Sequence, residues 1–178
     1  MIGRRLFVVS ATAFAAAPRT SAAVSSGDVL VMKTFYLYQA NDVLLERGLQ
    51  VDALAAYTKR LIAKANAVLS VAGPTARASG ALVVALKPPA RSRVWVMVGE
   101  KAREAEFTSA LRAPLESVPP PTVSGIYAFA IAFEARGGGE PLKTPGSLPV
   151  PDEWTQAVAR CKLNRVLPDC PLEIIWPD

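Results

Sequence analysis

The sequence predicts an α+β fold in which a small antiparallel sheet packs against one or two helices. Residues 52–70 place apolar side chains at spacings of three and four, which is typical of an amphipathic helix. Residues 81–98 hold two strand-like runs around a proline-rich turn, and residues 126–135 alternate bulky with small apolar side chains. We therefore expect a hairpin and a strand after a crossover helix. The predicted units are a signal peptide (residues 1–23), an α+β domain (24–140) and a C-terminal extension (141–178).

The N-terminus has the organisation of a secretory signal peptide. Arg4 and Arg5 precede an uncharged, mostly apolar run over residues 6–17, and small residues follow. This run is shorter than the roughly 20 residues that span a bilayer. We expect cleavage near Ala22 or Ala23 and a periplasmic or secreted protein. The alternative is an uncleaved N-terminus, which would be the chain's only membrane contact.

The composition excludes several classes of function. The chain has 178 residues, 20 of them basic and 15 acidic, and 51% are hydrophobic, which is enough for an ordinary globular domain. Signal cleavage would remove three arginines and no acid, leaving 17 basic side chains, so we expect no nucleic-acid partner. The chain has no histidine, which excludes a Ser-His-Asp triad, a Cys-His pair and a histidine-ligated zinc site. We expect no cofactor and no metal.

Upstream of the hairpin, an ambiguous segment precedes a clear helix. Residues 24–38 fit a strand or a helix, so their structure stays open. A helix is expected from Asp42 onward, and Gly48 is a position at which it would divide in two. The second part should end at Gly73 and the proline after it, because glycine suits the left-handed cap and proline cannot continue a helix. Its buried stripe is Leu54, Tyr57, Leu61, Ala65 and Val68.

The predicted hairpin joins residues 81–86 to residues 93–98. Both runs are apolar and of strand length, and the turn holds Pro88 and Pro89, which cannot donate in a ladder. In the second run Trp95 alternates with valines, so both of its faces are apolar. This pattern predicts a central strand that is covered on both sides.

A crossover helix should connect the hairpin to the next strand. Acidic residues suit its beginning near residue 100, and an apolar stripe continues to residue 118. Pro114 lies inside this pattern, so we expect a kink or an early end there. Prolines 119–121 then force an extended connection. The strand over residues 126–135 has a bulky face and a flat alanine face, against which a helix can pack closely.

The C-terminal extension is proline-rich and should contain a short helix and a disulfide loop. Asp152 is a candidate cap for the helix. In an exported protein, two cysteines in one short segment favour a disulfide between Cys161 and Cys170. Closing a loop of about ten residues would stabilise the fold by about 2.7 kcal/mol. Residues 172–176 are a candidate edge strand.

The order of segments between residues 81 and 135 carries a resemblance to a known family. Two paired strands (83–86 and 93–98) are followed by a crossover helix (107–118), a proline joint and an alternating strand (128–133). This order resembles the C-terminal domain of TonB-type periplasmic energy transducers. The resemblance implies an α+β fold and a domain that binds another envelope protein. No Ser-Ser-Gly follows the second strand, no Tyr-Pro precedes the first strand and no long proline-rich spacer precedes the domain, so the resemblance implies the fold more than energy transduction.

A basic cluster and a glycine triplet are the first candidate sites. Lys87, Arg91 and Arg93 gather at the hairpin tip, where they would contact an anion or an acidic partner, or else stay solvated and protect the sheet edge. The glycines at 137–139 lack a following Lys-Ser or Lys-Thr, so a turn is expected there and not a phosphate-binding loop.

The strand over residues 126–135 supplies the remaining candidates. Tyr127, Phe129 and Phe133 would contact a partner strand or pack in the core. Glu134 and Glu140 flank the glycine turn, and a catalytic pair would require a suitable separation between their carboxylates.

Three hypotheses of function follow from these patterns. The leading one is an exported, non-enzymatic domain that binds another envelope protein, for example by pairing at a sheet edge. The second is a hydrolase that uses Asp or Glu without histidine. The third is an accessory or inhibitor protein stabilised by its disulfide.

Overall fold

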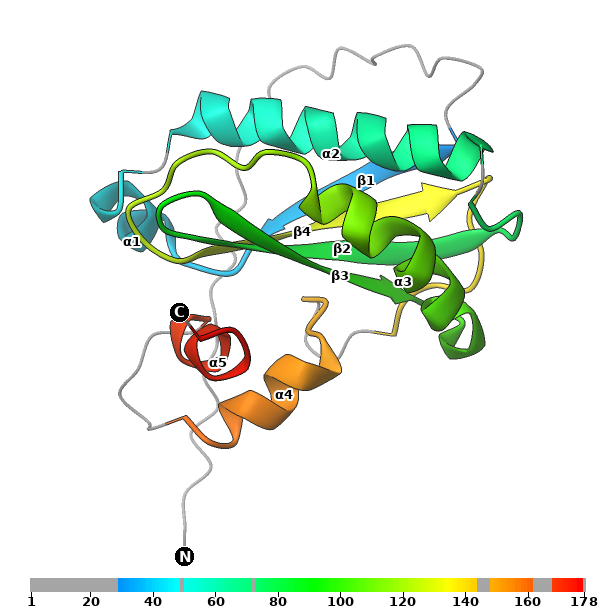
Figure 1. Ribbon diagram of the computed structural model, residues 1–178. Helices are drawn as coiled ribbons and strands as arrows, with labels where there is room; N and C mark the ends of the chain where they lie inside the picture. Colours follow the sequence, from blue (N-terminus) through cyan, green and yellow to red (C-terminus); the bar gives the residue numbers. More distant parts are fainter. Residues whose placement is uncertain (1–28, 49, 72, 144–147, 162–167, 178) are drawn as a thin grey trace, which may run out of the picture.

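The computed structural model describes residues 29–48, 50–71, 73–143, 148–161 and 168–177 (Figure 1). The predicted signal peptide lies outside these residues. Within them, four antiparallel strands form one sheet and helices pack on it, which confirms the α+β fold. In chain order, the elements are β1 (Leu30–Leu37), α1 (Asn41–Glu46), α2 (Val51–Val71), β2 (Ala78–Lys87), β3 (Arg91–Val98), α3 (Lys101–Glu116), β4 (Tyr127–Ala135), α4 (Asp152–Val158) and α5 (Asp169–Ile175).

The strands lie in the order β1-β4-β2-β3, and each neighbouring pair is antiparallel. β2 and β3 form the predicted hairpin. The connection through α1 and α2 joins β1 to β2, and α3 joins β3 to β4, so each crossover returns to the sheet beyond one intervening strand. β4 and β2 are therefore central, and β1 and β3 form the two edges.

Helices α2 and α3 cover one face of the sheet (Figure 1). Their buried stripes include Tyr57 and Leu61 on α2 and Phe107 on α3. The ring of Phe129 on β4 stacks on Phe35 of β1 at 5.2 Å between centroids and meets Tyr57 edge-on. This apolar layer is the main core, and its burial is the principal driving force for folding.

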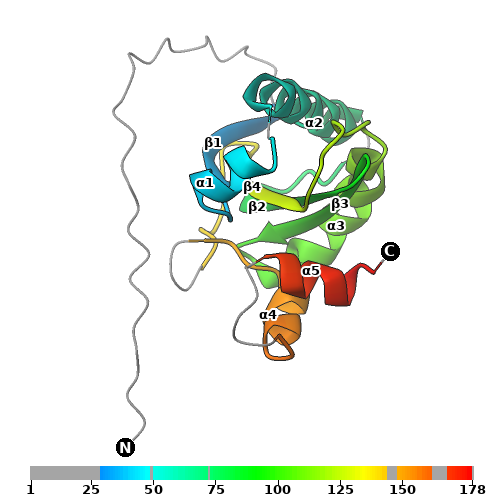
Figure 2. The same ribbon diagram turned by 90° about the vertical axis from the view of Figure 1, so that its left-hand side faces the viewer.

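Helices α4 and α5 cover the opposite face, so the sheet is the middle of three layers (Figure 2). Ala128 and Ala130 of β4 form the flat surface on which Trp154 of α4 and Leu172 of α5 are buried. Trp154 also lies edge-on to Trp95 of β3, with 5.3 Å between ring centroids. The small side chains of β4 allow this close approach, as the alternation in the sequence predicted.

Covalent and ionic contacts hold α5 in place. The predicted disulfide between Cys161 and Cys170 is present, with 5.9 Å between the Cα atoms, and it ties the end of α4 to the beginning of α5. The guanidinium of Arg47 donates to both carboxylate oxygens of Asp169 in the first turn of α5. This hydrogen bonding raises the pKa of Arg47, although partial burial acts in the opposite direction.

Two expectations about strands were wrong. β3 is an edge strand and not a central one. Both of its faces are apolar because α3 covers one and Trp154 of α4 covers the other, and this pattern resembles that of a central strand. The apolar run at residues 172–176 lies largely in α5 and forms no edge strand. Its Leu172 is buried against the alanine face, and a short helix buries this side chain as well as an edge strand would.

The ends of the helices mostly follow the glycine and proline signals. Gly48 has a φ of +66° and separates α1 from α2, as predicted. α3 does not end at Pro114, because it continues through the proline for two more residues to Glu116. Asp152 is not a cap, because Pro151 occupies that position and Asp152 begins the first turn of α4.

Candidate functional site

The basic cluster lies beside the C-terminal end of α5. The Lys87 ammonium donates to the Trp176 carbonyl at 2.7 Å, and Arg93 donates to the Ile175 carbonyl at 2.8 Å. Arg91 stacks its guanidinium over the Trp176 ring. A helix C-terminus carries partial negative charge and unpaired carbonyl groups, so these cations stabilise the end of α5.

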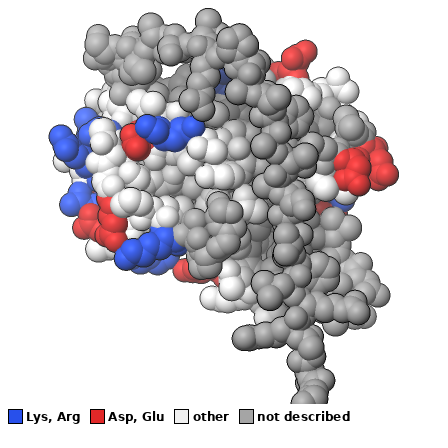
Figure 3. Space-filling view, turned by 180° about the vertical axis from the view of Figure 1, so that it is seen from behind, with Lys and Arg blue, Asp and Glu red and all other residues white. Residues whose placement is uncertain are grey.

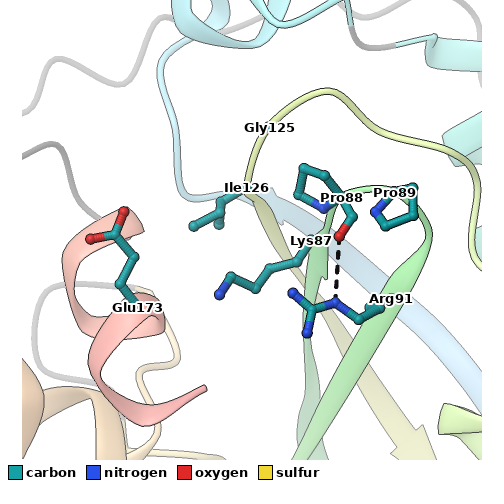
Figure 4. A pocket seen from close by; sticks show the side chains of 7 residues that line it. All are labelled: Lys87, Pro88, Pro89, Arg91, Gly125, Ile126 and Glu173. Carbon is teal, nitrogen blue, oxygen red and sulfur yellow. Dashed lines mark hydrogen bonds between the residues drawn. The ribbon is translucent and has the colours of Figure 1, made fainter. Parts of the chain in front are cut away.

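A pocket of about 390 Å³ separates the hairpin tip from α5 (Figure 4). Lys87 and Arg91 extend from one side of this pocket, and Glu173 lies on the other. Arg91 also donates to the Pro88 carbonyl at 3.4 Å. The lining mixes both charges, and its cations contact the chain's own C-terminal segment. These contacts give the basic cluster an intramolecular role.

The aromatic residues of β4 belong to the core. Tyr127, Phe129 and Phe133 are almost fully buried beneath α2, and β4 has a neighbouring strand on each side. A contact with a partner strand would require exposed side chains and an open edge, and this strand has neither. The Tyr127 hydroxyl donates to the Arg47 carbonyl at 2.5 Å.

The two glutamates at the glycine turn form separate ion pairs. Glu134 pairs with Lys33 of β1, and Glu140 pairs with Lys143, each at 3.2 Å. Gly137 and Gly138 have φ values of +86° and +81°, so this segment is a turn of left-handed residues, as expected. Among the residues with described positions, no group of three or more acidic or cysteine side chains could hold a metal ion.

The two edges of the sheet differ in how their backbone groups are satisfied. At the β3 edge, Glu116 of α3 accepts a hydrogen bond from the Val94 N–H at 3.0 Å. The Thr108 hydroxyl, also on α3, donates to the Val96 carbonyl at 3.4 Å. Side chains of α3 therefore occupy groups that another strand would need.

The outer edge of β1 is more open. Asn66 of α2 caps Leu30 by accepting from its N–H at 2.7 Å and donating to its carbonyl at 3.0 Å. The register with β4 and the bond from Tyr38 N–H to the Ala128 carbonyl place the backbone groups of Met32, Phe35 and Leu37 on the outer side. In the described part of the chain, no strand or side chain meets the outward groups of these three residues. We call residues 32–37 with these groups the β1 edge.

An apolar groove runs beside this edge. It has a volume of about 330 Å³, and its walls are the side chains of β1 and α2. Met32 is 42% exposed, Leu37 36% and Val51 70%, although each is a large apolar side chain. In the part of this side that Figure 3 draws in white, the surface is uncharged, and charged side chains lie at its margin. The residues of the apolar groove are Met32, Phe35, Val51, Leu54, Ala55, Thr58 and Lys59.

Two lysines lie close to the groove. Lys33 lies at the irregularity in the register between β1 and β4, and its ammonium forms an ion pair with Glu134. Lys59 lines the groove from α2, and no described residue forms an ion pair with it. The site thus combines open backbone groups, an apolar wall and one uncompensated positive charge.

Comparison with known protein families, with curated proteins and with solved structures found no match. No helix within the described ranges is both long enough and apolar enough to cross a membrane.

The sequence patterns did not predict the β1 edge, because residues 24–38 fitted a helix as well as a strand. The signal that was available was the row of large apolar side chains at Met32, Phe35 and Leu37.

Proposed function

We propose that this chain is an exported, non-enzymatic domain that binds an extended segment of another envelope protein at the β1 edge. The observation that carries this proposal is the difference between the two sheet edges. Side chains of α3 occupy backbone groups of β3, whereas the outward groups of Phe35 and Leu37 lie open beside the apolar groove. An open edge with apolar pockets beside it is the arrangement on which strand addition depends.

The location outside the cytoplasm rests on two supports. The first is the signal-peptide pattern over residues 1–23. The second is the disulfide between Cys161 and Cys170, since such bonds persist mainly in oxidising compartments. The resemblance of residues 81–135 to TonB-type C-terminal domains agrees with a periplasmic protein-binding role. The β1 edge lies outside that segment, so the proposed surface does not depend on the resemblance.

The energetics require the groove as well as the edge. A hydrogen bond between backbones contributes about 0.5–1.5 kcal/mol net, so the few that Phe35 and Leu37 can form give only several kcal/mol. A micromolar complex needs about 8 kcal/mol beyond the costs of association. Apolar side chains of the partner must therefore be buried beside Val51 and Leu54, where each contributes about 1.5–3 kcal/mol.

Site-specific photo-crosslinking tests the proposal. A photoreactive phenylalanine analogue replaces Leu37 in the chain expressed in its native cells, and the control replaces Ala113, an exposed residue of α3. We expect a discrete adduct with one envelope protein from position 37 and none from position 113. Equal labelling from both positions, or no adduct from position 37, would contradict the proposed surface.

The variant Leu37→Pro adds a test that is specific to the backbone. The N–H of Leu37 points outward and has no role in pairing with β4, and proline is tolerated on the solvent side of an edge strand. Leu37→Ala loses the same side chain but keeps the N–H. Binding should be weaker for Leu37→Pro than for Leu37→Ala, whereas equal binding would mean that the partner uses side chains alone.

A further inference from the structure

We propose that the segment bound at the β1 edge is an acidic one: a strand with apolar side chains at alternate positions and a carboxylate on the side that faces α2. This inference rests on the proposed function, because it describes the occupant of the same surface. It depends on three features that coincide at the groove, namely its shape, its backbone groups and its charge.

The backbone fixes which side chains of the incoming strand enter the groove. Residues directly opposite one another in an antiparallel pair project to the same face of the sheet. Met32 and Phe35 project toward α2, since they lie opposite Phe133 and Ile131 of β4 in the main core. Every second residue of the added strand therefore lies beside α2, and the intervening residues lie on the other face.

The groove selects apolar side chains at those positions. Its walls include Met32, Phe35 and three apolar residues of α2, and its volume of about 330 Å³ accommodates large aliphatic side chains. Filling it would cover Val51, which is 70% exposed. An apolar side chain there gains roughly tenfold or more in affinity over alanine.

Lys59 supplies the preference for an acid. Its side chain lines the groove, and no acidic residue of the described chain pairs with it. Lys33, the other lysine at this edge, already pairs with Glu134 at 3.2 Å. A carboxylate beside Lys59 would compensate the remaining charge, and complementary charges favour the correct partner and its approach.

The same charges disfavour a second copy of this chain as the occupant. β1 has the sequence LVMKTFYL, which contains a lysine and no acid. Antiparallel pairing of two β1 strands would place basic residues from both copies at one interface and leave Lys59 uncompensated. An irregular register and an edge lysine are also features by which natural sheets resist pairing with themselves.

Synthetic peptides of defined sequence test the inference. The probes are acetylated and amidated peptides in which isoleucine alternates with threonine, and one isoleucine is replaced in turn by glutamate, glutamine or lysine. A further probe carries its carboxylate at the free C-terminus, which distinguishes a side-chain acid from a chain end. Affinity is measured by fluorescence anisotropy with the processed chain, and size-exclusion chromatography with light scattering gives the oligomeric state.

Charge reversal at Lys59 provides the decisive comparison. We expect a carboxylate probe, whether side-chain or C-terminal, to bind about two- to fivefold tighter than the glutamine probe, the range of an exposed ion pair. Lys59→Glu should invert this order in favour of the lysine probe. The control Lys64→Glu makes the same charge change at an exposed position of α2 outside the groove, and it should preserve the order.

The other outcomes separate this inference from the proposed function. Binding that Leu37→Pro weakens but that shows no preference for acid would overturn the acidic occupant and leave strand addition standing. A dimer that Leu37→Pro dissociates would assign the edge to a second copy. Peptide binding that is tenfold weaker in the unprocessed chain would mean that residues 1–23 occupy the β1 edge. Failure of every probe, together with no adduct from position 37, would reject both proposals.

Discussion

Replacing Trp154 with alanine tests whether α4 is an integral layer of the fold. Trp154 is 2% exposed, and its ring lies 5.3 Å from that of Trp95 and 5.2 Å from that of Tyr38. Truncating a buried tryptophan to alanine costs about 3–5 kcal/mol, because the transfer energy of the ring is lost and a cavity remains. For a domain of this size, that loss lowers Tm by roughly 10 °C.

The conservative variant Trp154→Phe provides the matched control. A phenyl ring keeps part of the contact with Ala128 and Ala130, and it removes an indole Nε1 that has no acceptor among the described residues. We expect a loss of about 1 kcal/mol for this variant. Urea denaturation followed by far-ultraviolet circular dichroism measures both variants. A loss below about 1 kcal/mol for Trp154→Ala would refute the view that α4 closes the second face of the sheet.

Three further predictions concern the segments that hold the second layer together. Replacing Cys161 and Cys170 with alanine should lower the free energy of unfolding by about 2.7 kcal/mol, measured by urea denaturation, and a neutral effect would contradict the chain-entropy argument for a loop of about ten residues. Arg47→Met leaves Asp169 without its partner and should lower the free energy of unfolding by about 1–3 kcal/mol, whereas Arg47→Lys should retain part of this stability. Equal losses for the two variants would contradict a stabilising role of the paired hydrogen bonds from Arg47 to Asp169. Burial raises the pKa of Tyr38 above its ordinary value of 10.0, so the fold favours the neutral phenol and stability should decline as the pH rises through 10 and beyond. Each buried tyrosine contributes a slope of up to about 1.4 kcal/mol per pH unit, and Tyr38→Phe should reduce the total slope; an unchanged slope would show that Tyr38 does not cause it.

The elements with regular periodicity were predictable because their packing is local in the sequence. Two elements bury a side that the sequence periodicity indicates directly: the helix over residues 52–70 and the alternating strand over residues 126–135. Apolar residues recur every three to four positions in the helix and every two positions in the strand. The alanine face of β4 also predicted a closely packed helix, and α4 with α5 supplies it.

β1 escaped prediction for a physical reason. The register shifts between Met32 and Thr34, so Met32, Phe35 and Leu37 share a face although their spacing is three and then two. A spacing of three is what a helix would show, and the alternation that marks a strand is lost. An irregularity of this kind is visible only when the partner strand is known.

The edge position of β3 and the role of the basic cluster depend on residues distant in the sequence. Trp95 indicated a covered strand correctly, but its cover is Trp154, almost 60 residues away, and not a further strand. Lys87 and Arg93 were correctly placed near the hairpin tip, yet their acceptors are carbonyls at the end of α5. Local patterns reported burial and charge in both cases, and they could not identify the partner.

Residue-resolved amide exchange by NMR tests the central claim, that the β1 edge is open and accepts an acidic strand. In the free processed chain, the N–H groups of Phe35 and Leu37 should exchange rapidly, while that of Tyr36, which pairs with β4, is protected. Addition of the glutamate-containing peptide should slow the exchange of Phe35 and Leu37 and leave Tyr36 unchanged. Protection of Phe35 and Leu37 already in the free chain, or no change when the peptide binds, would contradict the account.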